Sequence, residues 1–482
     1  FHILLLHYYL KIIMKHEQTL KDVQKDFQDS ILPGLEDFVR IDNLSPEFDP
    51  EWETNGKAEK AGNHLINWAL KQGVKGMKAE LVKEKGRTPL VFIEIDANGS
   101  NKTVLLYGHF DKQPPLGEWD EGLAPTKPVV KDGKLYGRGA SDDGYALFAI
   151  VESIKVIQLQ GGKHGRIVIT IESGEESGSP DLVYYLKSLS ERIGTPDVMF
   201  CMDSGCIDYS AVWLTTSLRG VVNVECEVEC LKESVHSGSG SGIAPDSFTV
   251  LRILLDRLDD SKTSKIVAPL SVDIPDYRVT DAQKLAEYQK EKTVVDVVKL
   301  LDGVKPLTDN YAEIILNNTW RPTVVVTGIT GMPAAEGAGN VLRAKTKVKI
   351  SVRLPPTLDC QKASKILEEV LSKDPPYNSK VTVKIAAAGN GWAAKDMHES
   401  LKKSFSESSK FLFGKDYYNQ GEGGSIPFIA ELGELYPSCE IVVTGVLGPE
   451  SNAHCLNESL NLDYTQRMIV ALAHSINDFC SQ

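Results

Sequence analysis

Residues able to bind metal or transfer protons follow one apolar run of the chain. Residues 104–107 are typical of a strand buried on both faces, and His109 and Asp111 come directly after them. In open α/β sheets, ligands bind at the carboxyl ends of strands, so this histidine can offer its imidazole to a metal while the aspartate fixes its tautomer. Asp142 and Asp143 follow a Gly-Arg-Gly turn and precede a helical pattern. We therefore expect these carboxylates to face the same crevice.

Three further segments add carboxylates and a second imidazole. Glu175 and Glu176 lie in a Ser-Gly-Glu-Glu-Ser-Gly loop after a β-rich run, Asp203 follows the apolar strand 198–202, and His454 lies in a late loop. Two imidazoles and three carboxylates suit a pair of zinc or manganese ions. The expected ligand set is His109, Asp142, Glu176, Asp203 and His454.

The roles within this set follow from charge and reach. Two divalent cations about 3.5 to 4 Å apart repel strongly and need a bridging carboxylate, for which Asp142 is the natural candidate. Glu175 cannot easily turn to the same metal as its neighbour Glu176, yet it would reach a water on that metal, so it is the candidate general base. Each residue alone also has an ordinary explanation as a polar pair, a helix cap or a solvated turn. Their joint occurrence favours the metal site.

Composition excludes several other classes of function. The chain has 482 residues, 42% of them hydrophobic and 25% charged, which is typical of a large soluble protein with more than one domain. A net charge of -13 opposes phosphate binding, and without a basic stripe we expect no nucleic-acid partner. The eight cysteines show no Cys-x-x-Cys spacing, which argues against a thiol zinc site and favours a reducing, cytoplasmic compartment.

The first thirteen residues form an apolar segment interrupted by His2, His7 and Lys11. This segment is too short to span a bilayer and lacks a small-residue cleavage site, so we expect a translated leader or a short docking segment rather than a truncated signal or membrane anchor. Glycosylation sequons leave secretion as an alternative, although one of them, Asn98-Gly99, also fits a hairpin turn. The sequons lie at Asn98, Asn101, Asn317 and Asn457.

Helical and strand patterns alternate through the first two hundred residues. Apolar spacing predicts helices over 18–40, with a kink or break at Pro33, and over 57–72 and 143–159. Strands are predicted over 77–83, 90–96, 103–107, 166–172 and 198–202. This alternation predicts an α/β fold with a mainly parallel sheet.

After Trp213 the pattern changes to half-exposed strands. The runs 221–229, 344–353 and 380–386 read as strands, 245–258 and 359–372 read as helices, and 280–318 reads as helical and solvent-facing. This segment predicts an inserted α+β domain with an antiparallel sheet. A hinge-like turn at 389–392 then returns the chain to the first domain. The expected division is a catalytic domain from 1–212 and 394–482, with a lid or dimerisation domain over 213–393.

At the level of motifs, the chain resembles the dinuclear zinc metallopeptidases that include carboxypeptidase G, aminoacylase and the carnosine dipeptidases. The resemblance runs from about residue 20 to the late histidine, with five motifs in family order. The insert is most similar to the cytosolic non-specific dipeptidase branch. The motifs are Gly108-His109-Phe110-Asp111, Gly137-Arg138-Gly139-Ala140-Ser141-Asp142-Asp143, Gly174-Glu175-Glu176-Ser177-Gly178, the strand ending in Asp203, and His454.

This resemblance implies a metal assignment and a reaction. It places His109 and Asp203 on one ion, Glu176 and His454 on the other, and Asp142 between them, with Asp111 behind His109 and Glu175 as base. The cofactors would be two divalent ions per subunit, Zn²⁺ or Mn²⁺. The expected reaction is hydrolysis of dipeptides, Xaa-Gly or carnosine-like, by a metal-bound hydroxide.

The resemblance also implies substrate contacts and a homodimer formed through the insert. Arg353 would bind the terminal carboxylate of a dipeptide, with help from Ser425 and Asn340, and His236 would reach the active site of a partner subunit. The alternatives are that Arg353 pairs with a carboxylate of its own domain and that His236 is an ordinary loop histidine.

The sequence offers three alternatives to this function. A nucleotide-binding enzyme is disfavoured because Gly137-x-Gly139 lacks a third glycine and a Walker lysine. A non-catalytic protein on the same fold predicts missing ligands, and none is missing. Another N-acyl amino acid amidohydrolase, such as a deacylase or carboxypeptidase, stays open as the runner-up.

Overall fold

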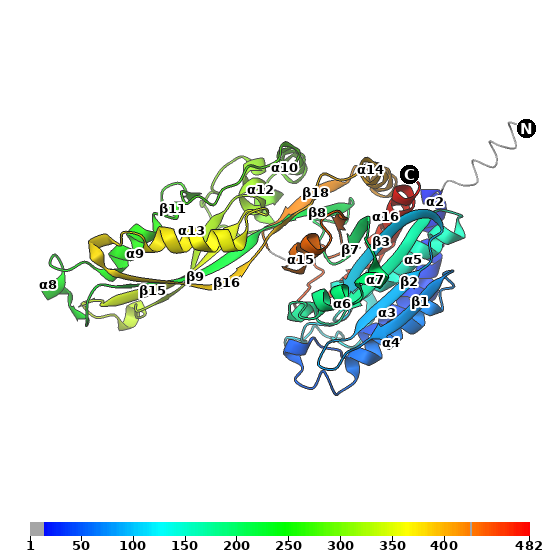
Figure 1. Ribbon diagram of the computed structural model, residues 1–482, viewed down its shortest axis with the longest axis horizontal. Coiled ribbons are helices and arrows are strands. Elements are labelled where there is room, and N and C mark those ends of the chain that lie inside the picture. The colour runs from blue at the N-terminus through cyan, green and yellow to red at the C-terminus, as the bar shows by residue number, and fades with distance from the viewer. Residues whose placement is uncertain (1–13, 425–426) are drawn as a thin grey trace, which may run out of the picture. The chain divides into compact units, whose positions relative to one another are not determined.

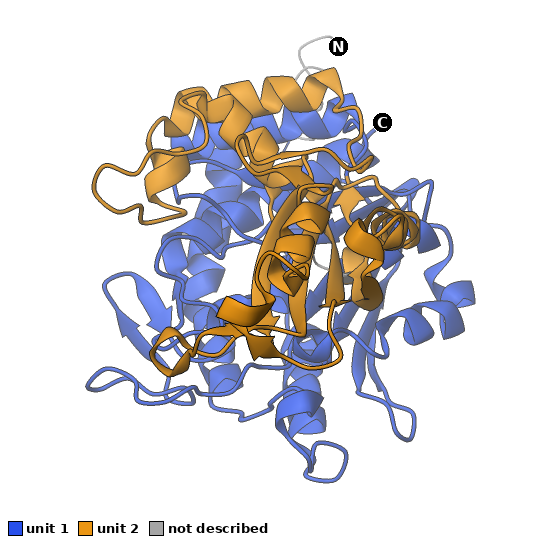
Figure 2. Ribbon diagram, turned by 90° about the vertical axis from the view of Figure 1, so that its left-hand side faces the viewer, with its two compact units in different colours: residues 1–215, 394–418, 431–482 blue, residues 216–393, 419–430 orange. Residues whose placement is uncertain are grey.

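The computed structural model describes residues 14–424 and 427–482, so the expectations for the first thirteen residues and for Ser425 lie outside the described residues. The chain forms two compact units (Figure 2). Unit 1 comprises residues up to 215 together with 394–418 and 431–482, and unit 2 comprises 216–393 and 419–430. We expected domain boundaries at 212/213 and 393/394, with all of 394–482 in the catalytic domain. In the structure, residues 419–430 belong to unit 2. Independent domains on these bounds stay a prediction.

The core of unit 1 is a mixed sheet whose central strands are parallel. Counted from one edge, its first six strands are β1 (Met77–Val82), β2 (Leu90–Ile95), β6 (His164–Glu172), β3 (Gly99–His109), β7 (Val198–Cys201) and β19 (Glu440–Val443), and β8 (Trp213–Leu218) pairs antiparallel with β19. β6, β3, β7 and β19 run parallel, whereas at one edge β2 pairs antiparallel with β6 and β1 pairs antiparallel with β2 (Figure 1). This arrangement confirms the predicted α/β class with a mainly parallel sheet.

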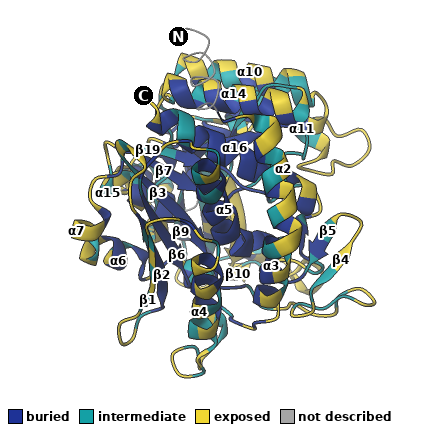
Figure 3. Ribbon diagram, turned by 90° about the vertical axis from the view of Figure 1, so that its right-hand side faces the viewer, coloured by how far each residue is buried: buried dark blue, intermediate teal, exposed yellow. Residues whose placement is uncertain are grey.

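Apolar helices pack against this sheet. α5 (Tyr145–Leu159) is buried around most of its circumference, as its continuous apolar sequence requires, and it contacts α16 (Leu462–Cys480) and β3. Figure 3 shows α5 in the colour of buried residues, whereas α4 (Lys57–Leu70) exposes one stripe. The other helices of unit 1 are α2 (His16–Asp26), α3 (Leu32–Val39), α6 (Leu182–Ser188), α7 (Ser190–Ile193) and α14 (Glu399–Phe413).

Of the kink or break predicted at Pro33, the structure shows no break in the helical path, although the regular α-helix is interrupted just before the proline. α2 continues through a π-helical segment, η1 (Phe27–Ile31), directly into α3, and Pro33 occupies the first turn of α3. The amide of Leu32 donates to the carbonyl of Phe27, five residues earlier. Because a wider turn precedes the proline, its missing N–H falls at the start of a new helical segment and the path of the chain stays helical.

Unit 2 contains a four-stranded antiparallel sheet in the order β13 (Thr323–Thr330), β15 (Lys345–Leu354), β9 (Gly220–Glu229) and β16 (Lys380–Gly389). β9 alternates strictly between buried and half-buried residues, and its apolar face packs under α9 (Ser247–Leu255) and α13 (Cys360–Ser372). The alternation read from the sequence therefore predicted an α+β unit correctly.

The middle of unit 2 is less helical than predicted. Helices α10 (Asp276–Gln289), α11 (Lys292–Val295) and α12 (Tyr311–Thr319) leave residues 296–310 without helix. Gly303 and Pro306 within this stretch explain why the helical pattern is not realised, since the first favours a turn and the second lacks an amide hydrogen.

Short elements complete the described chain, and within it no helix is long and apolar enough to cross a membrane. In unit 1, β20 (Ser459–Asn461), β5 (Lys134–Tyr136) and β4 (Val129–Lys131) form a small antiparallel sheet. The remaining elements are η2 (Pro46–Phe48), η3 (Ala140–Gly144), η4 (Glu175–Ser177), β10 (Val235–His236), α8 (Ser237–Gly240), β11 (Asp259–Asp260), β12 (Lys265–Ile266), η5 (Ala335–Gly337), β14 (Val341–Leu342), η6 (Pro376–Asn378), β17 (Trp392–Ala393), β18 (Tyr418–Glu422) and α15 (Pro427–Leu435).

Candidate metal centre

Parallel strand pairing brings the predicted ligands to one edge of the unit 1 sheet. His109 ends β3 and lies opposite Glu172 of β6, while Tyr107 lies opposite Cys201 of β7. Asp203, two residues beyond Cys201, therefore emerges at the level of His109. The His109 Nε2 atom lies 3.8 Å from Asp203 Oδ2. The predicted position of these residues at the carboxyl ends of neighbouring strands is realised.

Asp142 lies between the two histidines. Its Oδ1 atom is 3.2 Å from His109 Nε2, and its Oδ2 atom is 2.9 Å from His454 Nε2. His454 Nε2 is also 3.0 Å from Glu176 Oε2. Hydrogen bonds to Asp142 and Glu176 raise the pKa of His454 to about 11. A carboxylate with one oxygen toward each imidazole has the geometry that a bridging ligand needs.

Asp143 does not share this role. Its Oδ2 atom accepts the backbone N–H of His109 at 3.1 Å, and it lies where a Cβ on Gly108 would approach to 2.6 Å. Asp143 thus fixes the backbone of the histidine, and Gly108 leaves the space for it. The expectation that both aspartates face the crevice is corrected for Asp143, because the chain turns between the two residues: both have non-helical φ/ψ before α5 begins.

Asp111 orders the glutamate loop as well as the first histidine. Its Oδ1 atom lies 3.4 Å from His109 Nδ1, and its two oxygens accept the backbone N–H groups of Glu175 at 3.2 Å and Glu176 at 3.0 Å. Gln113, which the sequence reading did not single out, donates from Nε2 to Glu176 Oε2 at 2.6 Å. One short segment after β3 therefore orients both glutamates.

The donor groups form two overlapping clusters suited to metal ions. Ligand atoms of His109, Glu175 and Asp203 all lie within 4.8 Å of one another, and so do those of His109, Asp142 and Glu176. Imidazole nitrogens with carboxylate oxygens are the ligands that zinc and manganese accept. The residues present therefore fit two divalent cations, and the structure brings all five predicted ligands and Glu175 together.

The electrostatics of the cluster point the same way. Burial is the main cause that raises the pKa of Glu175 to about 8, with Glu176 and Asp142 adding to it and His109 opposing it. Burial also raises the pKa of Asp203 well above its usual range, despite the neighbouring His109. The cluster holds more carboxylates than its imidazoles can balance. Divalent cations would neutralise this excess of negative charge.

The backbone of His454 lies in the left-handed region, with φ of 57°. Such conformations are uncommon for residues other than glycine and tend to occur at functional sites. The loop is fastened by Glu458, which is fully buried and accepts the N–H groups of Gly139, Ser141 and Asp142 at 3.0 to 3.2 Å. Sequence reasoning missed Glu458, because nothing in its local sequence distinguishes it from a solvated loop glutamate.

The predicted substrate residues that the structure describes lie in unit 2, in two separate places. His236 on β10 pairs with β14, and the carbonyl of Asn340 accepts the N–H of Ser237 at 2.8 Å, so these two residues lie at one end of the unit. Gly238 donates to His236 Nδ1 at 3.1 Å, which leaves the proton of the neutral ring on Nε2.

Arg353 lies at the far end of β15, opposite Thr323 and Val221. Among the described residues no carboxylate forms an ion pair with Arg353. This finding argues against the alternative that Arg353 pairs with a carboxylate of its own domain. Burial, with the nearby charge of Arg353, lowers the pKa of Arg219 to about 10. Arg219 in turn donates from Nε to the carbonyl of Gly423 at 3.1 Å, in the glycine-rich loop that precedes Ser425.

Comparison with known proteins identifies the family. Residues 105–478 match peptidase family M20/M25/M40. The chain belongs to this family. It is therefore a hydrolase of the metallopeptidase type, and a dinuclear metal site fits the family, as the resemblance of its motifs predicted.

Relatives and solved structures extend over most of the chain. It is 28% identical over 379 residues to a cysteinylglycine-S-conjugate dipeptidase of Corynebacterium striatum, covering 78% of this chain and 80% of that protein. It is 25% identical over 382 residues to a β-Ala-His dipeptidase of Mus musculus, covering 77% and 76%. The solved structure of the di-peptidase Dug1p from Saccharomyces cerevisiae superimposes with a TM-score of 0.67 at 21% identity, over 97% of this chain and 100% of that one, which shows the same fold.

Proposed function

We propose that this protein hydrolyses the peptide bond of dipeptides with two divalent metal ions. The observation that carries the proposal is the position of Asp142, with one oxygen toward His109 and the other toward His454. Relatives named as dipeptidases for cysteinylglycine conjugates and for β-Ala-His support the substrate class.

In this proposal the residues of the site act either as metal ligands or as the general base. His109 and Asp203 would hold one ion, Glu176 and His454 the other, and Asp142 both. When bound, the ions would polarise the attacking water and the scissile carbonyl. Glu175 accepts a proton from the water at a carboxylate oxygen as the oxygen attacks the carbonyl carbon. It then returns the proton to the amine nitrogen as the C–N bond breaks.

Arg353 supports selection of dipeptides over longer peptides. Its guanidinium can bind the terminal carboxylate by two parallel hydrogen bonds, and it has no carboxylate partner of its own among the described residues. A cation that binds this terminus close to the reacting bond leaves no room for a third residue. Asn340 and Ser425 are proposed to add an amide and a hydroxyl.

The geometry of unit 2 supports a homodimer. β15 separates Arg353 from the end of the unit that holds His236 and Asn340, and its ten residues span about 30 Å. A dipeptide is much shorter than this distance. If Arg353 and His236 both contact one substrate, they must belong to two subunits, and His236 would then donate its Nε2 proton to the substrate across the dimer.

A substrate panel tests the proposal. Purified protein with zinc or manganese is assayed on Cys-Gly, β-Ala-His, a tripeptide and an N-acetyl amino acid. Hydrolysis of the dipeptides is expected, with little on the tripeptide. Faster hydrolysis of the N-acetyl amino acid would assign the chain to the deacylases of the same family.

A glutamate substitution tests the mechanism in the same assay. Glu175→Gln should lower kcat by about 10² to 10⁴-fold while the protein still binds metal. Glu121→Gln removes an exposed carboxylate of unit 1 and serves as the matched control. Full activity in Glu175→Gln would overturn the role of this residue.

We also propose a cytoplasmic location. None of the eight cysteines, all of which lie in the described residues, forms a disulfide, and one of them is exposed, which is compatible with a reducing compartment. Localisation of the tagged chain in its host would test this proposal.

A further inference from the structure

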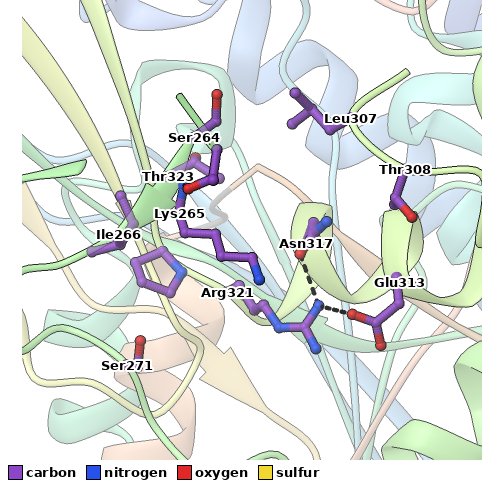
Figure 4. Close-up of a pocket in the computed structure, with 12 residues that line it drawn as sticks. Ser264, Lys265, Ile266, Ser271, Leu307, Thr308, Glu313, Asn317, Arg321 and Thr323 are labelled. Atoms are coloured by element: carbon purple, nitrogen blue, oxygen red, sulfur yellow. Dashed lines mark hydrogen bonds and ion pairs between the residues drawn. The ribbon is translucent and has the colours of Figure 1, made fainter. Parts of the chain in front are cut away.

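Unit 2 contains a cavity of about 560 Å³ that none of the predicted substrate residues lines. This volume is typical of sites for small organic molecules. Its wall combines β12, the start of β13 and helix α12 (Figure 4). The residues that line it include Lys265, Ile266, Leu307, Glu313, Arg321 and Thr323.

Two cations of this cavity face only one carboxylate. Arg321 uses a single nitrogen, Nη1, to bind Glu313 Oε2 at 2.8 Å and Asn317 Oδ1 at 2.8 Å. The remaining donors of its guanidinium, on Nε and Nη2, make no hydrogen bond within the described part of the chain. Lys265 has no ion-pair partner there either, and Figure 4 shows its ammonium directed toward the Arg321 side chain. The cavity therefore carries one unbalanced positive charge in a protein whose net charge is -13.

Hydroxyl groups surround these cations. Arg219 Nη1 donates to Thr323 Oγ1 at 3.1 Å, so the hydroxyl hydrogen of Thr323 stays available for another acceptor. Ser264 and Ser271 also line the cavity. The apolar side chains of Ile266 and Leu307 provide a surface for carbon atoms.

We propose that this cavity binds a small organic molecule through an oxyanion group, either a carboxylate or a phosphate. The free edge of the Arg321 guanidinium can form two parallel hydrogen bonds with two oxygens of such a group, and the Lys265 ammonium adds a charge-assisted contact. The hydroxyl of Thr323 supplies a further donor. The proposal concerns unit 2 alone and does not depend on the reaction in unit 1.

Isothermal titration of the full-length protein tests the proposal with two probes, inorganic phosphate and succinate, at constant ionic strength. At least one probe should bind saturably. Lys265→Gln should weaken that binding about tenfold or more, because it removes a charged hydrogen bond. Arg321→Lys keeps the charge but loses the paired donors, and should also weaken it. The probe that binds more tightly identifies the oxyanion.

Lys262→Gln is the matched control, since it removes an exposed lysine three residues away that does not line the cavity. Its binding should stay within about twofold of the wild-type value. The thermal midpoint of Lys265→Gln without probe should equal that of the wild type, because this side chain has no partner to lose. If Lys262→Gln and Lys265→Gln weaken binding of the probe equally, the effect is one of overall charge and the proposal is wrong. Unchanged binding in Lys265→Gln would place the anion elsewhere, for example at the metal centre, and no saturable binding of either probe would equally overturn the proposal.

Discussion

Arg138 Nη1 lies 2.9 Å from Glu458 Oε2, and this buried ion pair joins the loop that carries Asp142 to the loop that carries His454. Arg138 also donates from Nη2 to the carbonyl of Cys455 at 2.8 Å. Glu458 accepts the backbone N–H of Asp142 itself at 3.2 Å. Two proposed ligands that lie far apart in the sequence are thus held by one carboxylate, which makes Glu458 a positioning residue.

Glu458→Gln should weaken metal binding about 10 to 100-fold. The amide replaces one accepting oxygen by an NH₂ group that faces backbone N–H donors, so the Asp142 loop loses its fixed position. The measurement is competition for zinc with a chromophoric chelator, and kcat should recover when metal is added in excess. Glu450→Gln, in the same loop but on a side chain that is 81% exposed, is the control. Wild-type metal affinity in Glu458→Gln would contradict the positioning role.

Arg353→Ala should lower kcat/KM for free dipeptides by roughly 2 to 3 kcal/mol in transition-state free energy, mainly through KM. Dipeptide amides lack the terminal carboxylate, so their hydrolysis should change little. The measurement is a comparison of kcat/KM on matched pairs of substrates. Arg343→Ala, two residues before the start of β15, serves as the control. Equal losses on acids and amides would show that Arg353 supports the fold instead of the carboxylate.

Mixing two inactive variants tests action across a dimer. A chain with His236→Ala keeps Glu175, and a chain with Glu175→Gln keeps His236. If the histidine acts on the partner's substrate, half of the dimers formed at random are mixed and each has one intact site. Activity should then recover to about a quarter of the wild-type value. The measurement is dipeptide hydrolysis after co-refolding or co-expression. A mixture no more active than its parents would argue for action within one subunit.

Glu152 on α5 should make stability depend on pH. Burial, opposed by Lys155 at 3.3 Å, raises the pKa of Glu152 from 4.5 to about 8. Because the folded pKa lies above the unfolded value, this residue's contribution is fully present below pH 4.5 and is lost as the pH rises through about 8. Glu152→Gln cannot ionise and should lack this loss.

From pH 5 to pH 9 the wild type should therefore lose unfolding free energy relative to Glu152→Gln, by roughly 2 to 4 kcal/mol. Denaturant unfolding at several pH values measures it, and the comparison cancels the effect of pH on metal binding. Glu191→Gln, an exposed carboxylate, should show no such shift. A constant difference across this range would show that Glu152 is ionised in the folded protein throughout.

The sequence by itself determined the candidate residues of the site and the class of the fold. His109, Asp142 and Glu176 could be identified because each lies in a short motif whose residue types suit metals, next to a strand or helix pattern. Apolar runs for buried strands and strict alternation for half-exposed ones predicted the parallel sheet of unit 1 and the antiparallel sheet of unit 2. These features are local, since they depend on side-chain type and on the period of the backbone.

Only the tertiary structure decided which polar residues support the site. Lys112 directly follows Asp111 in the sequence, yet it is buried and its ammonium donates to the carbonyls of Phe38, Val39 and Ile41 at the end of α3. Glu458 resembles a surface glutamate, yet it is fully buried beneath Asp142. The same side chain is solvated or buried according to which distant segment packs on it. That choice depends on long-range contacts between loops, and no local pattern encodes it.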